Sequence, residues 1–151
     1  MKSLKDKMTE RERIVKYLKG YYYATREIRQ TQEEQEALSY DFGLKSPNVN
    51  GTPGGSGTSD LSKHVIKAEE LEKKLEERKE KQLQIMAEIS ALIEGLEASE
   101  ERLILRYRYL ALDKGRLRTW ERIAELCNYS RISVIRIHEH AIEHLFKDDT
   151  K

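Results

Sequence analysis

The chain has few of the residues that build disulfide scaffolds, metal sites or membrane spans. Its 151 residues include one cysteine, Cys127, which excludes an intramolecular disulfide and a cysteine-based zinc site. No stretch approaches the roughly 18 consecutive apolar residues of a membrane helix, and the first residues, MKSLKDKMTERER, have no apolar signal-peptide core. We therefore expect a soluble protein of a reducing compartment, without a membrane partner, cofactor or metal.

An excess of charge of either sign is also missing. The chain has 28 Lys and Arg residues against 27 Asp and Glu, a net charge of +1. The whole molecule is therefore not a general polyanion binder, and a nucleic-acid surface has to be local. Charged residues make up 36% and hydrophobic residues only 38% of the chain, a composition that favours long solvated helices over a single compact core.

Proline and glycine are scarce outside one stretch. Both prolines and five of the eight glycines lie between Gly43 and Gly57. The sequence VNGTPGGSGTSD in and after this stretch superficially resembles a phosphate-binding loop, but it has no lysine and lacks the P-loop spacing. Its composition is that of a flexible connector. We predict a linker over residues 41–60.

Long helices are predicted on both sides of this linker. Residues 1–40 are rich in Glu, Lys, Arg and Gln, and steps of four and three residues define a thin seam. Its members are Ile14, Leu18, Tyr21, Thr25, Ile28, Gln32 and Gln35. Residues 61–97 repeat the pattern with Leu61, Val65, Ala68, Leu71, Leu75, Gln82, Ile85, Ile89, Leu92 and Leu96. An antiparallel coiled-coil hairpin and an intermolecular bundle both satisfy this pattern.

Residues 98–147 predict a compact domain of three shorter helices, which makes the fold class all-α. Each helix follows a residue suited to capping. These are Ser99 before a helix to about Leu112, Thr119 before Trp120–Cys127, and Ser130 before a helix from Arg131 to about Phe146. The expected buried face of the first helix consists of Leu103, Ile104, Tyr107, Leu110 and Ala111, and that of the third of Val134, Ile137, Ala141 and Leu145.

The last two helices have the features of a helix-turn-helix. Asn128 tolerates left-handed backbone geometry where the short turn requires it, and Ala124 is small where the helices meet. Because such a motif places the start of its second helix in the major groove, residues off the buried stripe should face bases. These candidates are Arg131, Ile132, Ser133, Ile135 and Arg136.

Phosphate contacts are expected around this helix. Between Asp113 and His138 there are six basic residues against three acidic ones. The phosphate candidates are Lys114, Arg116, Arg118, Thr119, Ser130 and His140. His138 is also expected at the rim of the groove, as a hydrogen-bond donor.

The stretches EERLILRYRYL and TWERIAELCNYSRISVIRIHEHAIEHL resemble domain four of bacterial sigma factors. The complete layout is similar to phage and prophage transcriptional regulators of the ArpU/RinA kind. This resemblance implies DNA-binding control of late or packaging genes in the cytoplasm of a bacterial host. It implies base reading by Arg131, Ser133 and Arg136, and phosphate contacts by Thr119 and Ser130. Asn128 replaces the glycine that is common in that turn.

Other functions remain to be weighed against this one. HAIEH, from His140 to His144, matches the H-x-x-E-H zinc-peptidase signature, but a third protein ligand and a cleft are not indicated, and we expect no enzyme. The leading prediction is a sequence-specific regulator that binds double-stranded DNA and forms a homo-oligomer, preferably a dimer, through its N-terminal helices. The alternatives are a coiled-coil adaptor that binds RNA polymerase or a phage protein without reading DNA, and a packaging protein similar to a terminase small subunit.

Overall fold

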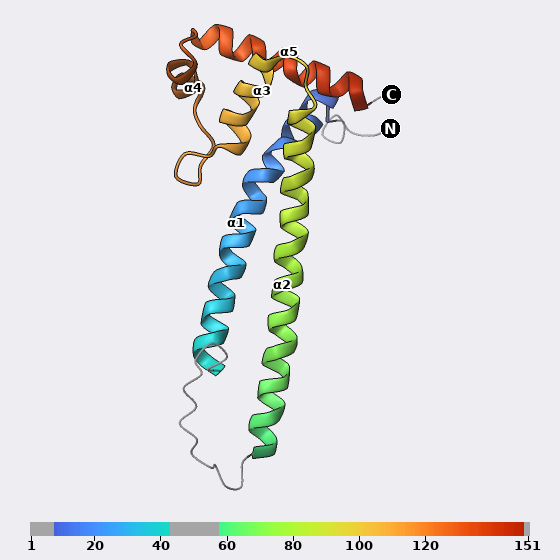
Figure 1. Ribbon diagram of the computed structural model, residues 1–151, viewed down its shortest axis with the longest axis vertical. Helices are drawn as coiled ribbons and strands as arrows, with labels where there is room; N and C mark the ends of the chain where they lie inside the picture. The colour runs from blue at the N-terminus through green and yellow to red at the C-terminus, as the bar shows by residue number, and fades with distance from the viewer. Residues whose placement is uncertain (1–7, 43–57, 150–151) are drawn as a thin grey trace. The chain divides into compact units, whose positions relative to one another are not determined.

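The computed structural model describes residues 8–42 and 58–149. The predicted all-α class is confirmed, because every regular element in these two ranges is helical. The elements are α1 (Glu10–Phe42), α2 (Thr58–Glu94), α3 (Ser99–Leu105), the π-helical segment η2 (Arg106–Leu110), α4 (Trp120–Cys127) and α5 (Arg131–Asp149) (Figure 1). Most of the predicted linker lies outside the described residues.

The chain divides into two compact units. The first unit comprises Met1–Thr25 and Gln84–Lys151, and the second unit comprises Arg26–Leu83. Helices α1 and α2 therefore contribute residues to both units.

In α1, the Thr9 hydroxyl accepts a hydrogen bond from the Glu12 N–H at 3.2 Å, which caps the helix.

The second unit has a polar seam, which we define as Thr31, Gln35, Leu38, Ser39, Ala68 and Leu75. Only Leu38, Ala68 and Leu75 form an apolar cluster. The Gln35 amide donates to Glu76 at 3.0 Å, and Arg78 pairs with Glu34 at 2.6 Å. Since these contacts join α1 to α2 in opposite chain directions, the helices of this unit pair antiparallel within one chain.

Two predicted members of the helical seam are wrong. Gln32 is exposed, and the fully buried residue beside it is Thr31, whose hydroxyl donates to the Glu27 carbonyl at 2.7 Å. A short side chain that bonds its own helix can be buried here, whereas the longer glutamine amide remains solvated. Leu71 is likewise 45% exposed, because the inward stripe of α2 continues from Ala68 through the half-buried Glu72 to Leu75.

The first unit has a continuous apolar core. It brings together residues from α1, the end of α2 and the turn after it, α3, η2 and α5. The buried members are Leu18, Ile89, Ile93, Leu96, Leu105, Tyr109, Ala141, Ile142 and Leu145. Gly20 lies at a close approach between α1 and α2, since a Cβ there would be 3.3 Å from the Ile89 Cδ1 atom. Burial of apolar surface of this kind is the main source of folding free energy.

The predicted buried face of the first short helix is partly wrong. Leu103 and Ala111 are exposed, whereas Leu105 and Tyr109 are buried. The buried face of this segment thus includes Glu101, Leu105 and Tyr109, at steps of four residues, and the α-helix ends at Leu105 and continues as the π-helical turn η2. The Ala111 N–H bonds to the Arg106 carbonyl at 2.7 Å, five residues back, and each such bond encloses one residue more than an α-helical bond.

The predicted capping role of Ser99 is also wrong. Ala98 is the N-cap residue of α3, and no side chain caps this helix. Arg102 instead donates to the carbonyls of Leu96 and Glu97, at 2.5 and 2.9 Å. Its guanidinium thus satisfies carbonyl groups after the end of α2.

Candidate nucleic-acid interface

Helix α4 has the caps that the sequence predicts at both ends. The Thr119 backbone is extended, and its hydroxyl accepts from the Arg122 N–H at 3.2 Å. The helix ends at Asn128, which is left-handed with φ 61° and ψ 38°. The Tyr129 N–H then bonds to the Ala124 carbonyl at 3.0 Å, so the turn satisfies the end of the helix.

The predicted cap of α5 is confirmed as well. The Ser130 hydroxyl oxygen accepts from the Ser133 N–H at 3.1 Å and lies 2.9 Å from the Ser133 hydroxyl. A hydroxyl that accepts a capping bond still carries a proton that it can donate. The Thr119 hydroxyl likewise accepts the capping bond of α4. Its proton remains available for a phosphate contact.

A small apolar cluster holds α3, α4 and α5 together. Its buried members are Ile104, Ile123, Ala124 and Val134, with Tyr107, Trp120, Cys127 and Ile137 packed against them. Of the predicted stripe on α5, Val134, Ala141 and Leu145 are buried and Ile137 is half-buried. The stripe also includes Ile142 and His138, which sequence reasoning did not place there.

The base candidates lie together on the first turns of α5 and differ in exposure. Ile132 is 69% exposed. Arg131 and Arg136 are exposed, and Ser133 and Ile135 are half-buried. A single exposed isoleucine is ordinary on a protein surface, so its exposure establishes only that Ile132 is accessible to a partner.

Arg131 is already engaged with an acidic residue. Its Nε lies 2.7 Å from the Glu121 Oε1 atom on α4. The pKa of Glu121 is held below its usual range, chiefly by a hydrogen bond from its own backbone N–H and also by Arg131. Glu121 is therefore ionised and orients the Arg131 side chain. This pair was not predicted from the sequence, although the predicted turn already implies that α4 and α5 are in contact.

The connector between η2 and α4 is a tight turn. Asp113 and Arg116 exchange two backbone hydrogen bonds of 2.9 and 3.0 Å. The two residues between them, Lys114 and Gly115, both have positive φ, 53° and 77°, as in the turns that close two-residue hairpins. The Lys114 and Arg116 side chains are exposed and make no hydrogen bond or ion pair with a described residue.

Two arginines fasten this connector. Arg118 Nε donates to the Ala111 carbonyl at 2.9 Å, and its guanidinium lies 5.5 Å from the Tyr107 ring centre. Arg108 bonds to the Arg118 carbonyl and lies 4.4 Å from the Trp120 ring centre. Arg118 is half-buried, so this phosphate candidate also holds the loop, through a cation–π contact and a backbone bond.

The expectation for His138 is wrong, because the ring is buried and not at a groove rim. It is only 2% exposed, and its Nε2 lies 2.7 Å from the Tyr109 hydroxyl. The Trp120 ring packs edge-on at 4.7 Å. Burial lowers the pKa of His138 to about 4 and raises that of Tyr109 to about 12. His138 is thus neutral at physiological pH, and its Nε2 shares a hydrogen bond with the protonated Tyr109 hydroxyl.

The other two histidines of α5 have different surroundings. His140 is exposed, and His144 Nδ1 lies 2.8 Å from Glu101 on α3. Within residues 8–42 and 58–149, no group of three or more His, Cys, Asp and Glu side chains is arranged to hold a metal ion. His140 keeps the exposure that a phosphate contact requires.

Comparison with known proteins adds no family. No family model, curated protein or solved structure matches this chain. Among the described helices, none is long and apolar enough to cross a membrane.

Proposed function

We propose that the chain binds double-stranded DNA through α4 and α5, as a helix-turn-helix, and acts as a transcriptional regulator of a phage or prophage. The observation that carries this proposal is the presentation of α5. A capped α4, a left-handed Asn128 and a capped α5 leave Arg131 and Ile132, at the start of α5, exposed to solvent. That is the part of a recognition helix that enters the major groove.

The charges around α5 support this assignment. Lys114, Arg116 and Arg136 are exposed, and their side chains have no hydrogen-bond or ion-pair partner among the described residues. Cations that are left without an internal partner are available to phosphates. We assign Arg136 and Ile132 to base edges and Lys114 and Arg116 to the backbone, with Ile132 suited to a thymine methyl group.

Arg131 can read a base without losing Glu121. The ion pair uses its Nε atom, and an arginine has further donors on its two Nη atoms. The Nη pair can make the two hydrogen bonds to guanine O6 and N7. Glu121 then acts as a positioning residue that reduces the freedom of the side chain before binding.

Oligomerisation is proposed to use the long helices. Among the described residues of the second unit, four large apolar side chains are exposed, namely Tyr40, Ile66, Leu71 and Leu83. Because half of the residues in its own seam are polar, an intermolecular contact on these side chains would add apolar burial that the unit lacks. Sedimentation should show a dimer in the free protein, whereas a ring of many copies would favour the packaging alternative.

The same exposed side chains favour a second candidate function, an adaptor that binds RNA polymerase or a phage protein. This role requires no base reading. In that case the protein would bind its partner equally well with and without the arginines of α5, and DNA selection would return no consensus.

The deciding experiment is selection of bound sequences from random duplex DNA. The wild type should return a consensus, and replacing Arg131 and Arg136 by Ala should weaken binding to it by roughly 5- to 150-fold per lost arginine–guanine contact. Arg29→Ala, in the second unit and exposed, is the matched control. Replacing Lys114 or Arg116 should instead weaken binding to all sequences and reduce the salt slope by about one. An unchanged consensus and affinity in the double variant would refute the proposal.

A further inference from the structure

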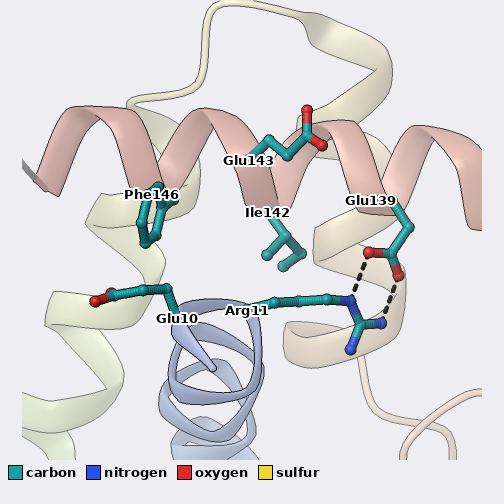
Figure 2. Close-up of a pocket in the computed structure, with 6 residues that line it drawn as sticks. All are labelled: Glu10, Arg11, Glu139, Ile142, Glu143 and Phe146. Atoms are coloured by element: carbon teal, nitrogen blue, oxygen red, sulfur yellow. Dashed lines mark hydrogen bonds and ion pairs between the residues drawn. The ribbon is translucent and has the colours of Figure 1, made fainter. Parts of the chain in front are cut away.

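A pocket lies between the first turn of α1 and the second half of α5, both within the first unit (Figure 2). Its volume is about 240 Å³, and it is lined by Glu10, Arg11, Glu139, Ile142, Glu143 and Phe146. Ile142 and Phe146 point from α5 toward α1 and provide its apolar surface (Figure 2). None of these residues belongs to the base or phosphate candidates.

The charge of Arg11 is already neutralised within the pocket wall. Its Nε and Nη2 donate to the two oxygens of Glu139, at 2.6 and 2.5 Å. This fork is the strong, two-bond geometry of arginine and carboxylate. It holds the pKa of Glu139 below its usual range and leaves neither group in need of another partner.

The two remaining carboxylates have no comparable partner. Glu143 is exposed and makes no hydrogen bond or ion pair with any side chain that the structure describes. Glu10 has only a 3.7 Å contact with Arg13 on the same exposed helix face, a kind of pair that contributes little. Three carboxylates and one guanidinium give the lining a net charge of −2.

We propose that this pocket docks a basic peptide segment of a partner protein. One lysine or arginine of the segment lays its aliphatic stem on Ile142 and Phe146. Its charged head is attracted by the lining carboxylates Glu10 and Glu143, which lie on opposite sides of the pocket (Figure 2). Long basic side chains bind in this divided way, with the stem on apolar surface and the charge in water, and the Phe146 ring offers an additional cation–π contact.

Size and charge select this occupant over others. The pocket is smaller than the roughly 300–1,000 Å³ of sites for drug-sized ligands, so it suits one side chain better than a cofactor. Its negative lining repels nucleic-acid phosphates, and the site is therefore separate in chemistry from the proposed DNA surface. The inference does not rest on DNA binding.

Selection of peptides tests the proposal directly. The full chain is used to select binders from a random 12-residue peptide library, and the best peptide is synthesised and measured by fluorescence anisotropy. We expect Lys or Arg next to an apolar residue, and a loss of at least tenfold in affinity for Glu143→Lys. Glu143→Gln should show a smaller loss. Glu88→Lys, the same charge change at an exposed residue outside the pocket lining, should change affinity less than twofold.

Three outcomes would overturn it. An acidic or absent consensus would do so, as would a basic peptide whose affinity is unchanged in both Glu143→Lys and Phe146→Ala. If Glu143→Lys instead dissociates the protein's own oligomer in sedimentation, the occupant is a second copy of this chain and not a foreign segment. Circular dichroism of each variant separates these results from loss of folding.

Discussion

The two units of this chain bury very different side chains, although α1 and α2 contribute to both. The first unit has an apolar core, mainly of leucine and isoleucine, contributed by α1, the end of α2, α3, η2 and α5. Among its described residues, the second unit buries Thr31, Gln35 and Ser39 beside three apolar residues. Helix formation alone is therefore no measure of stability, because packing supplies most of it. We expect the second unit to open at lower free energy than the first.

The largest effect should come from the core of the first unit. Ile93→Ala removes a fully buried side chain, and we expect a loss of about 2–5 kcal/mol in the free energy of unfolding. Leu75→Ala is the counterpart in the second unit, where polar neighbours and nearby solvent limit the loss to about 2 kcal/mol. Urea denaturation of both variants measures the two losses in the free energy of unfolding. An equal or larger loss for Leu75→Ala would remove the contrast between the units.

A comparable loss in the free energy of unfolding is expected in the first unit at low pH. Burial lowers the pKa of His138 from 6.5 to about 4, so the unfolded chain binds the extra proton between these values. Stability is complete above about pH 6.5 and falls as the pH decreases toward 4, by up to about 3 kcal/mol. Denaturation midpoints across this range provide the measurement.

A matched pair of variants isolates the contribution of His138. His138→Gln should flatten the pH dependence, because glutamine does not titrate and still offers an acceptor to Tyr109. His140→Gln, at an exposed position of the same helix, should leave the slope unchanged. The assignment fails if the slope is the same in His138→Gln and wild type.

A smaller effect is expected at the left-handed turn after α4. Asn128 has φ 61°, where a side chain branched at Cβ is strained. Asn128→Val should cost about 1–3 kcal/mol, whereas Asn128→Gly should be neutral or stabilise by a few tenths. Thermal unfolding of the two variants gives the comparison. Similar melting temperatures for the two variants would show that the turn in Asn128→Val has changed its backbone conformation.

The smallest effect should come from the surface of the second unit. Arg78 and Glu34 form an ion pair whose side chains are 44% and 46% exposed. We expect Arg78→Ala to lower the free energy of unfolding by less than about 1 kcal/mol, and by less still in high salt. Double-mutant analysis with Glu34→Ala measures the coupling between the two side chains. A coupling above about 2 kcal/mol would mean that this unit depends on its charges more than on its seam.

Local features of the candidate site were predictable from the sequence. Thr119, Ser130 and Asn128 act on the backbone within a few residues of themselves, so their types alone indicate where α4 and α5 begin and end. The all-α class follows from composition and periodicity in the same way. The bounds of α4 agree with the prediction at both ends.

Features that depend on distant contacts were not predictable. The burial of His138 requires Tyr109 and Trp120 to meet it, and these two residues lie in η2 and α4, far from His138 in the sequence. The Glu121–Arg131 pair and the pocket at Arg11 and Glu139 likewise join separate helices. A sequence pattern records which side chains are apolar, but it does not show which polar side chains tertiary contacts will cover.

The π-helical turn at Arg106–Leu110 has a consequence for the length of the chain. It holds one residue more than a continuous α-helix needs to cover the same rise. A protein shorter by one residue within this turn could therefore form an unbroken α-helix there, without changing the direction in which the helix continues on either side. The π-helical turn thus lets the chain include one additional residue between α3 and the connector to α4.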